Sequence, residues 1–304
     1  MKWLELSIRT TPEYVEPISE LFRRYGEGGV VVEEVGDWDP DEVSGELAPP
    51  TSVTVRTYIP LDATVQSRRE MIDIGVRLIS LLQPMGDLKE RELEEDEWET
   101  AWKSHFTLLR VGKRLVIKPT WHEYTSVGGE EVVELDPGMA FGTGHHPTTR
   151  MCLEELERRI LPGMRVLDLG TGSAILAIAA AKLGAAEVVA MDIASDVLPV
   201  ARSNIGSNGV AQRVRVLGGT LPHQRVKLAS FDLVVANITA QTIADLAHSI
   251  AEVLIPSGVL VASGILVEQQ AKVEEALSNE PLEIVERRHD DDWALLVARR
   301  LPHS

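Results

Sequence analysis

From residue 108 onward, short apolar runs alternate with stretches in which apolar residues recur at helical spacing. The short runs predict buried strands, and the spaced stretches predict helices with one apolar face. Strands and helices in alternation are typical of an α/β fold, in which a mostly parallel sheet carries helices on both faces. We therefore expect a Rossmann-like domain in residues 108–304.

The predicted elements of this half follow one another closely. Strands are expected at residues 107–110 and 114–119, as a hairpin, and at 131–135, 165–169, 187–192, 214–217, 231–238, 256–264, 282–288 and 293–298. Helices are expected at residues 151–160, 175–183, 195–208, 243–254 and 268–277.

Residues 1–93 follow a different order, namely strand, helix, strand, strand, helix, strand. The strands are expected at residues 3–9, 30–35, 52–59 and 87–93, and the helices at 13–25 and 65–82. This order is that of the ferredoxin-like split motif, so we expect a small α+β domain that precedes the larger one.

Between the two halves, the segment EEDEWETAWKSHF places Trp98, Trp102 and Phe106 on one face of a predicted helix. We interpret residues 94–107 as a linker helix whose aromatic face packs against one or both domains. A role of these aromatic side chains in contacting a ligand is the less favoured alternative.

Composition places the chain among ordinary globular proteins, with 304 residues, 44% hydrophobic and 25% charged. We expect no membrane segment, because no apolar run approaches the roughly 18 residues that span a bilayer. The N-terminus lacks the pattern of a signal peptide, so a cytoplasmic location is expected. One cysteine, Cys152, excludes an intrachain disulfide and a cysteine-rich metal site, and we interpret it as a buried structural thiol.

The formal net charge is −17. Non-specific nucleic-acid binding depends on Lys and Arg, so this charge argues against it and favours a basic partner. Solubility alone is an equally good explanation of the charge.

The first candidate site follows the predicted strand RVLDL. Gly170 and Gly172 form a bend there, and glycine lets a ligand approach the backbone closely. The next strand ends in Asp192, about 20 residues further on, where a doubly wound sheet holds the two hydroxyls of a ribose. A dinucleotide fingerprint would need a third glycine at Ile175. The pattern therefore favours a nucleoside without phosphate, of which S-adenosylmethionine is the main candidate, over an ordinary glycine turn.

A second glycine-rich segment, residues 136–149, ends at the N-terminus of a predicted helix that Thr148 or Thr149 would cap. Such a position suits a carboxylate, and the methionine part of the cofactor carries one. His145 and His146 suggest a metal at first sight, but adjacent side chains point apart and no further ligand pattern supports them. We expect no metal.

Several of these segments together resemble the PrmA family of ribosomal protein methyltransferases, and the resemblance covers nearly the whole chain. The segments that carry it are WLELSI, EPISELFRRYGEGGVVVEE, EDEWETAWKSHF, LDPGMAFGTGHHPTT, LDLGTGSAILAIAAAKLGA, FDLVVANI and PSGVLVASGI. The resemblance implies a class I methyltransferase domain at residues 108–304, a ferredoxin-like substrate-recognition domain at 1–93, and S-adenosylmethionine as cofactor. It also implies methylation of lysine side-chain and N-terminal amines of large-subunit ribosomal protein L11 (L-eleven), free or on the ribosome.

The resemblance also implies cofactor contacts at Thr149, Gly170, Asp192 and Asn237. Asn237 would border the transfer site, and no general base can be assigned. Two departures from the family pattern are Ala174, where a third glycine is usual, and Ala194, where a second acidic residue often stands. The full set of cofactor-binding residues that we expect is Phe141, Gly142, Thr143, Gly144, Thr149, Asp168, Gly170, Gly172, Asp192 and Asn237.

Three alternatives stay open. The first is a related protein-lysine methyltransferase with another substrate. The second is a nucleic-acid N-methyltransferase, but the end of the strand predicted at residues 231–238 reads Asn237-Ile-Thr-Ala and lacks the proline and aromatic residue of that class. The third is a binding module fused to an inactive nucleotide fold, against which the intact glycines and Asp192 argue. We expect a monomer without sequence-specific nucleic-acid contacts.

Overall fold

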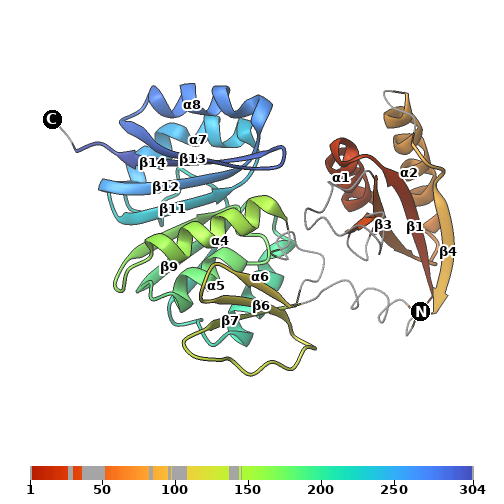
Figure 1. Ribbon diagram of the computed structural model, residues 1–304, viewed down its shortest axis with the longest axis horizontal. Coiled ribbons are helices and arrows are strands. Elements are labelled where there is room, and N and C mark those ends of the chain that lie inside the picture. Colours follow the sequence, from red (N-terminus) through yellow and green to blue (C-terminus); the bar gives the residue numbers. More distant parts are fainter. Residues whose placement is uncertain are drawn as a thin grey trace, which may run out of the picture. The chain divides into compact units, whose positions relative to one another are not determined.

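A computed structural model describes residues 2–26, 30–35, 52–81, 85–94, 97, 108–136, 144 and 146–302. It divides the chain into two compact units, a small unit Met1–Phe106 and a large unit Thr107–Ser304 (Figure 1). The predicted linker helix, with Trp98, Trp102 and Phe106, lies almost entirely outside the described residues. No helix among the described residues is long and apolar enough to cross a membrane.

The small unit is an antiparallel four-stranded sheet with two helices. Its elements are β1 (Lys2–Thr10), a 3-10 turn (Pro12–Tyr14), α1 (Val15–Tyr25), β2 (Val30–Val35), β3 (Ser52–Pro60), α2 (Val65–Ser80) and β4 (Lys89–Glu94). The strands lie in the order β2-β3-β1-β4. The predicted order of elements is thus the observed one, with boundaries that differ by one to a few residues.

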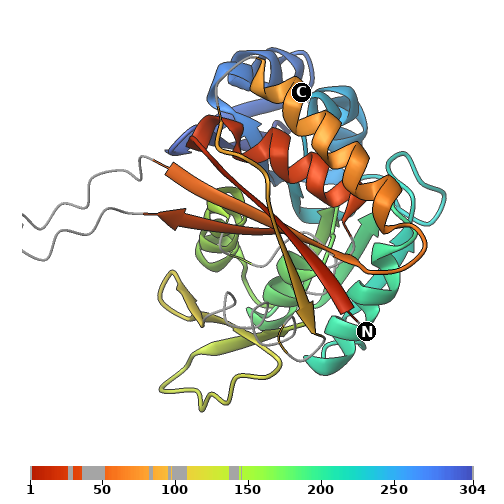
Figure 2. The ribbon, with the colours of Figure 1, turned by 90° about the vertical axis from the view of Figure 1, so that its right-hand side faces the viewer.

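Both helices of the small unit cover the same face of its sheet. Alternate residues of β1, Leu4, Leu6 and Ile8, share one buried cluster with Ile18 of α1 and Ile72 of α2. This arrangement follows from the period of two along a strand, which turns every second side chain to the same face. Figure 2 shows α1 and α2 beside each other.

The large unit is built on a seven-stranded sheet in the order β10-β9-β8-β11-β12-β14-β13. Its strands are β8 (Arg165–Leu169), β9 (Glu187–Asp192), β10 (Val214–Gly218), β11 (Phe231–Asn237), β12 (Leu254–Leu266), β13 (Leu282–Asp290) and β14 (Trp293–Arg300). The strands from β10 to β12 are parallel, whereas β14 runs antiparallel to both of its neighbours. The expectation of a largely parallel sheet is met.

Helices cover both faces of this sheet, as the alternation along the chain predicted. They are α4 (Pro147–Arg159), α5 (Ile175–Lys182), α6 (Val197–Ser207), α7 (Ala240–Val253) and α8 (Gln270–Ser278). One buried cluster joins α4, α5 and α6 to one face, and a second joins α7 and α8 to the other (Figure 1). Because both faces are covered, the strands read as continuous apolar runs rather than as alternating ones.

A second sheet in the large unit was not anticipated. β5 (Leu109–Val111), β6 (Leu115–Pro119) and β7 (Glu131–Leu135) form a separate three-stranded sheet, in which β6 pairs antiparallel with β5 and parallel with β7. Its buried side chains join the cluster that contains α5. The strands were predicted within about two residues, and the predicted hairpin of β5 and β6 is confirmed. The addition of β7 to form a separate sheet was not predicted.

The order of the strands marks where a ligand is expected. Successive strands run outward from β8 through β9 to β10, and the chain then returns to add β11 on the other side of β8. The carboxyl ends of β8 and β11 therefore flank a topological switch point, which is the usual ligand crevice of an open α/β sheet.

Candidate functional site

The glycine turn after β8 is held against β9. The amides of Gly170 and Thr171 both donate to the carbonyl of Met191, at 2.8 and 2.9 Å. Gly170 has a φ of +77°, and a Cβ at this position would lie 2.2 Å from Cγ2 of Ile238. Only glycine fits both the backbone conformation and the space, so the predicted requirement for glycine is confirmed at this position.

Asp192, at the end of β9, has a carboxylate whose orientation is set by the backbone. Its Oδ2 accepts from the amide of Gly172 at 2.9 Å, and its Oδ1 accepts from the amide of Ala194 at 3.0 Å. Each carboxylate oxygen has further lone pairs with which to accept from a ligand. Because Ala194 contributes only its amide, the absence of an acidic side chain at that position leaves this geometry intact.

Asp168 is fully buried beneath the same turn. Its Oδ2 accepts from Oγ1 of Thr171 at 2.6 Å and from the amide of Ala177 at 3.1 Å. Its Oδ1 has no hydrogen-bond partner among the described residues. Burial raises the pKa of Asp168 to about 7, and the charge of Asp192 adds to the rise. A buried acceptor without a donor is costly. Because Asp168 is fully buried, its carboxylate can act on a ligand through its charge but not by contact.

Ala174 adopts a left-handed backbone conformation, with φ +67° and ψ +18°, immediately before α5. Such a conformation costs about 1–2 kcal/mol for a residue with a Cβ. The side chain of Ala174 is fully buried in the core cluster and is not among the residues that line the pocket described below. Its methyl group therefore does not face that pocket.

Thr149 and Asn237, which are far apart in the chain, meet at the site. Nδ2 of Asn237, at the end of β11, donates to Oγ1 of Thr149 at 3.1 Å. Thr149 lies in the first turn of α4, whose N-cap is His146, and the ring Nδ1 of His146 accepts from the amide of Thr148 at 3.4 Å. The prediction that Thr148 or Thr149 caps the helix is wrong. Because His146 occupies the capping position, the hydroxyl of Thr149 faces Asn237 instead.

These groups surround a pocket of about 330 Å³ at the carboxyl edge of the large sheet. Five predicted residues line it, namely Thr149, Gly170, Gly172, Asp192 and Asn237. The lining residues that the sequence analysis missed are Leu169, Thr171, Ile175, Leu176, Ile193, Val197, Gly219, Thr220, Ile238, Thr239 and Thr242. Thr239 could have been found, because a threonine before a helical stretch is a capping signal, and its hydroxyl does cap α7.

Two other predicted residues that the structure describes, Gly144 and Asp168, do not line this pocket. Gly144 is buried with φ +92°, and a Cβ there would lie 3.3 Å from Cδ1 of Ile175. Asp168 lies beneath the turn rather than at the pocket wall. Phe141, Gly142 and Thr143 lie outside the described residues, as does His145.

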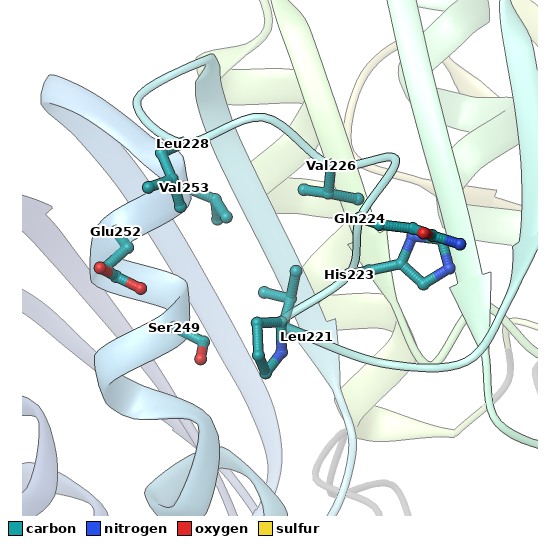
Figure 3. Close-up of a pocket in the computed structure, with 9 residues that line it drawn as sticks. Leu221, His223, Gln224, Val226, Leu228, Ser249, Glu252 and Val253 are labelled. Carbon is teal, nitrogen blue, oxygen red and sulfur yellow. The ribbon is translucent and has the colours of Figure 1, made fainter.

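A second pocket, of about 280 Å³, lies between the β10–β11 connection and α7 (Figure 3). Its walls are mainly apolar, with Leu221, Val226 and Val253, and Ser249 and Glu252 add polar atoms. No predicted site residue lines it.

The pocket at the carboxyl edge fits a nucleoside that carries a positive charge. Its volume is within the range of about 300–1,000 Å³ that is usual for small-molecule sites. The fixed carboxylate of Asp192, which lines the pocket, suits a ribose diol, and its negative charge favours a cationic ligand. Among the described residues, no group of three or more His, Cys, Asp or Glu side chains could hold a metal ion.

Known proteins resemble this chain over most of its length. A family model described as ribosomal protein L11 methyltransferase (PrmA) matches residues 2–301. A ribosomal protein L11 methyltransferase of Chloroflexus aurantiacus is 42% identical over 324 residues, which cover 98% of each chain. One of Pelotomaculum thermopropionicum is 42% identical over 309 residues, which cover 98% of this chain and 99% of the other.

A solved structure adds a comparison of folds. The crystal structure of a ribosomal protein L11 methylase from Lactobacillus delbrueckii subsp. bulgaricus superposes with a TM-score of 0.58 at 34% identity. It covers 64% of this chain and 98% of the other.

Proposed function

The chain belongs to the ribosomal protein L11 methyltransferase (PrmA) family, and from this premise we propose that it methylates lysine side-chain and N-terminal amines of ribosomal protein L11. It is an enzyme that uses S-adenosylmethionine, with an α/β fold of class I. The observation that carries the proposal is the arrangement of Asp192, the glycine turn and the Thr149–Asn237 pair around one pocket.

We propose roles for the individual residues in cofactor binding. Asp192 accepts from the ribose hydroxyls, and Gly170 and Gly172 admit the nucleoside to the backbone. The carboxylate of Asp168 supplies negative charge beneath the turn, opposite the positive charge of the ligand. The segment with Phe141, Gly142, Thr143 and Gly144, together with Thr149, closes the methionine side.

The cofactor, when bound, supplies a methyl group on a sulfonium sulfur. The chain's own contribution is to hold an uncharged amine in line with that methyl group and to exclude water. Asn237 suits this task, because its Nδ2 is engaged by Thr149 and its Oδ1 is left to accept from an incoming amine. Proximity and orientation can account for effective molarities of about 10⁵ M or more, so no general base is required once the amine is uncharged.

The small unit is proposed to be a ferredoxin-like substrate-recognition domain. Its antiparallel sheet order β2-β3-β1-β4 and its two helices on one face support that fold. The net charge of −17 favours a basic protein partner, as a ribosomal protein commonly is, over nucleic acid. We propose residues 94–107 as the linker helix and a monomer in the cytoplasm as the working form.

Incubation of the enzyme with labelled S-adenosylmethionine tests the proposal, with unmethylated L11 protein, ribosomes that contain it, and transfer RNA as parallel acceptors. We expect label on lysine and N-terminal amines of L11, mapped by mass spectrometry. An Asn237→Ala variant should bind the cofactor yet transfer the label much more slowly. Label on another protein would support the alternative of a related lysine methyltransferase, and label on RNA would support a nucleic-acid enzyme.

The proposed role of the small unit has its own test. Residues 108–304 alone should bind S-adenosylmethionine as the full chain does, because the large unit has its own core. They should not methylate L11 at a measurable rate. Full activity of this fragment on L11 would show that recognition does not depend on the small unit.

A further inference from the structure

Asn204 joins the bases of the two glycine-rich segments. It lies in α6, and its side chain is almost completely buried, with 1% exposed. Its Oδ1 accepts from the amide of Asp136 at 3.0 Å, and its Nδ2 donates to the carbonyl of Asp136 at 3.2 Å. The same Nδ2 also donates to the carbonyl of Ser173 at 3.0 Å. One carboxamide thus binds the start of segment 136–149 and the glycine turn together.

Asn208, one helical turn later, provides a natural comparison. Its Oδ1 accepts from the amide of Glu134 at 2.9 Å, and its Nδ2 donates to the carbonyl of Glu134 and to that of Asn204. The two asparagines therefore form hydrogen bonds with alternate residues, Glu134 at one edge of β7 and Asp136 just beyond the strand. The other edge of β7 pairs with β6. Of the two asparagines, Asn204 is the one whose described hydrogen bonds also reach the glycine turn.

The bond to Ser173 acts on the strained part of that turn. The carbonyl of Ser173 belongs to the peptide plane that leads into Ala174, whose φ is +67°. A rotation of this plane would change φ of Ala174 and could relieve the left-handed conformation. The hydrogen bond from Asn204 opposes that rotation. It therefore fixes the backbone that carries Gly170 and Gly172, and with it the amide that Gly172 donates to Asp192.

We propose that Asn204 is a positioning residue for cofactor binding, which holds the glycine turn in its strained conformation and in register with the base of segment 136–149. The inference rests on the proposed function, in that the cofactor binds between these two segments. Asn204 does not line the pocket, so it acts through the backbone and not by contact with the ligand.

The experiment compares Asn204→Ala with Asn208→Ala in the full-length enzyme. The two variants lose the same side chain, one within α6 and one at its C-cap. Asn208→Ala releases the bonds to Glu134 of β7, and Asn204→Ala releases those to Asp136 just beyond it. We expect both to lower the melting temperature. Asn204→Ala should in addition weaken S-adenosylmethionine binding by about tenfold, the effect of about one hydrogen bond, whereas Asn208→Ala should change it by less than about twofold. The KM for the cofactor should rise in the same proportion, with the KM for L11 unchanged.

Two further variants separate positioning from loss of stability. Asn204→Asp, in its ionised form at high pH, keeps an acceptor for the amide of Asp136 but has no proton to donate to Ser173. At that pH it should bind the cofactor as weakly as Asn204→Ala, and it serves in place of that variant if the latter does not fold. Adding Ala174→Gly to Asn204→Ala should restore much of the affinity, because glycine needs no external bond to keep a positive φ.

Calorimetric titration of S-adenosylmethionine into each variant decides the outcome. Equal affinities of the Asn204 and Asn208 variants, or no recovery on adding Ala174→Gly, would overturn the inference. Failure of the wild-type enzyme to bind S-adenosylmethionine would instead overturn the proposed function, so the two failures are distinguishable.

Discussion

Two buried carboxylates in the large unit differ in almost every respect except burial. Glu155, on α4, is fully buried and is surrounded by arginines, with Arg159 at 2.7 Å and Arg288 at 2.9 Å, and Arg158 beside them. Burial opposes its ionisation, but the hydrogen bonds and charges of these arginines outweigh that effect and lower the pKa of Glu155.

Asp168 is also fully buried, but its surroundings raise its pKa instead of lowering it. Its donors are a hydroxyl and one backbone amide, both on Oδ2, and burial raises its pKa to about 7. A carboxylate satisfied by cations of its own chain stabilises the fold, whereas one left short of donors is available to a ligand. The donors around each carboxylate therefore separate these two residues where burial does not, and four experiments test this comparison.

The largest expected effect is the loss of folding stability when Glu155 is replaced. Glu155→Ala should lower the free energy of unfolding by about 3 kcal/mol, near the low end for the loss of one partner of a buried ion pair, because each arginine is partly exposed. Cofactor affinity should not change. Urea denaturation and calorimetry measure the two quantities, and Glu155→Gln, which keeps the shape, should lose less. A parallel loss of cofactor affinity would show that Glu155 belongs to the site after all.

The lowered pKa of Glu155 also determines how the stability of the fold changes with pH. A carboxyl group with a folded pKa below its ordinary value of 4.5 stabilises the fold above that value, and this contribution is lost as the pH falls below it. The difference in stability between the wild type and Glu155→Gln should therefore shrink in acid.

The next effect is on binding, at Asp192. Asp192→Ala should weaken S-adenosylmethionine binding by about 1–3 kcal/mol, the scale of lost hydrogen bonds to a charged group. Asp196→Ala is the matched control, because Asp196 is an exposed acidic residue that follows Asp192 closely in the chain. Calorimetry should show a change only for Asp192, and an unchanged affinity of that variant would reject its assignment to the ribose.

The third effect is the pH dependence that Asp168 imposes. With a pKa of about 7, this group is mostly ionised at pH 8 and mostly protonated at pH 6, so affinity for a cationic ligand should fall about tenfold over that interval. Asp168→Asn should flatten the profile and also controls for titration of the ligand. An identical slope in the variant would exclude Asp168 as the source.

The folding stability of the free enzyme should also depend on the ionisation of Asp168. It should fall as the pH rises, whereas the affinity for the cationic ligand should increase. Because the folded pKa lies above the ordinary 3.8, the folded state binds more protons and loses stability as the pH rises from about 4 to about 7.

The smallest effect is expected at Ala174. Ala174→Gly relieves about 1–2 kcal/mol of left-handed strain but increases the entropy of the unfolded chain by a comparable amount. The melting temperature should therefore change little. Cofactor affinity should stay within about twofold, because the methyl group is buried in the core and not in the pocket. A larger change in affinity would place this side chain at the ligand.

Part of the site could be predicted because strand ends are local features. Asp192 and Asn237 each close an apolar run, and the carboxyl ends of parallel strands meet at one edge of a sheet. The N-cap of α4 could not be predicted in this way, since histidine is not among the usual capping residues and threonines stood next to it. The hairpin of β5 and β6 was predicted and is confirmed. The parallel pairing of β6 with β7 was not predicted, because an apolar run alone does not identify its neighbouring strand.

The sequence by itself determined the periodicity of the elements, the glycines that the turn after β8 requires, and the residues that stand at the ends of strands. These depend on the φ and ψ of one residue or on neighbours a few positions away. Only the tertiary structure decided that Asn237 meets Thr149, that Asn204 reaches Ser173, and that Glu155 is matched by arginines while Asp168 is not. Those contacts join different elements, and which elements touch is set by how helices and strands pack around the shared core.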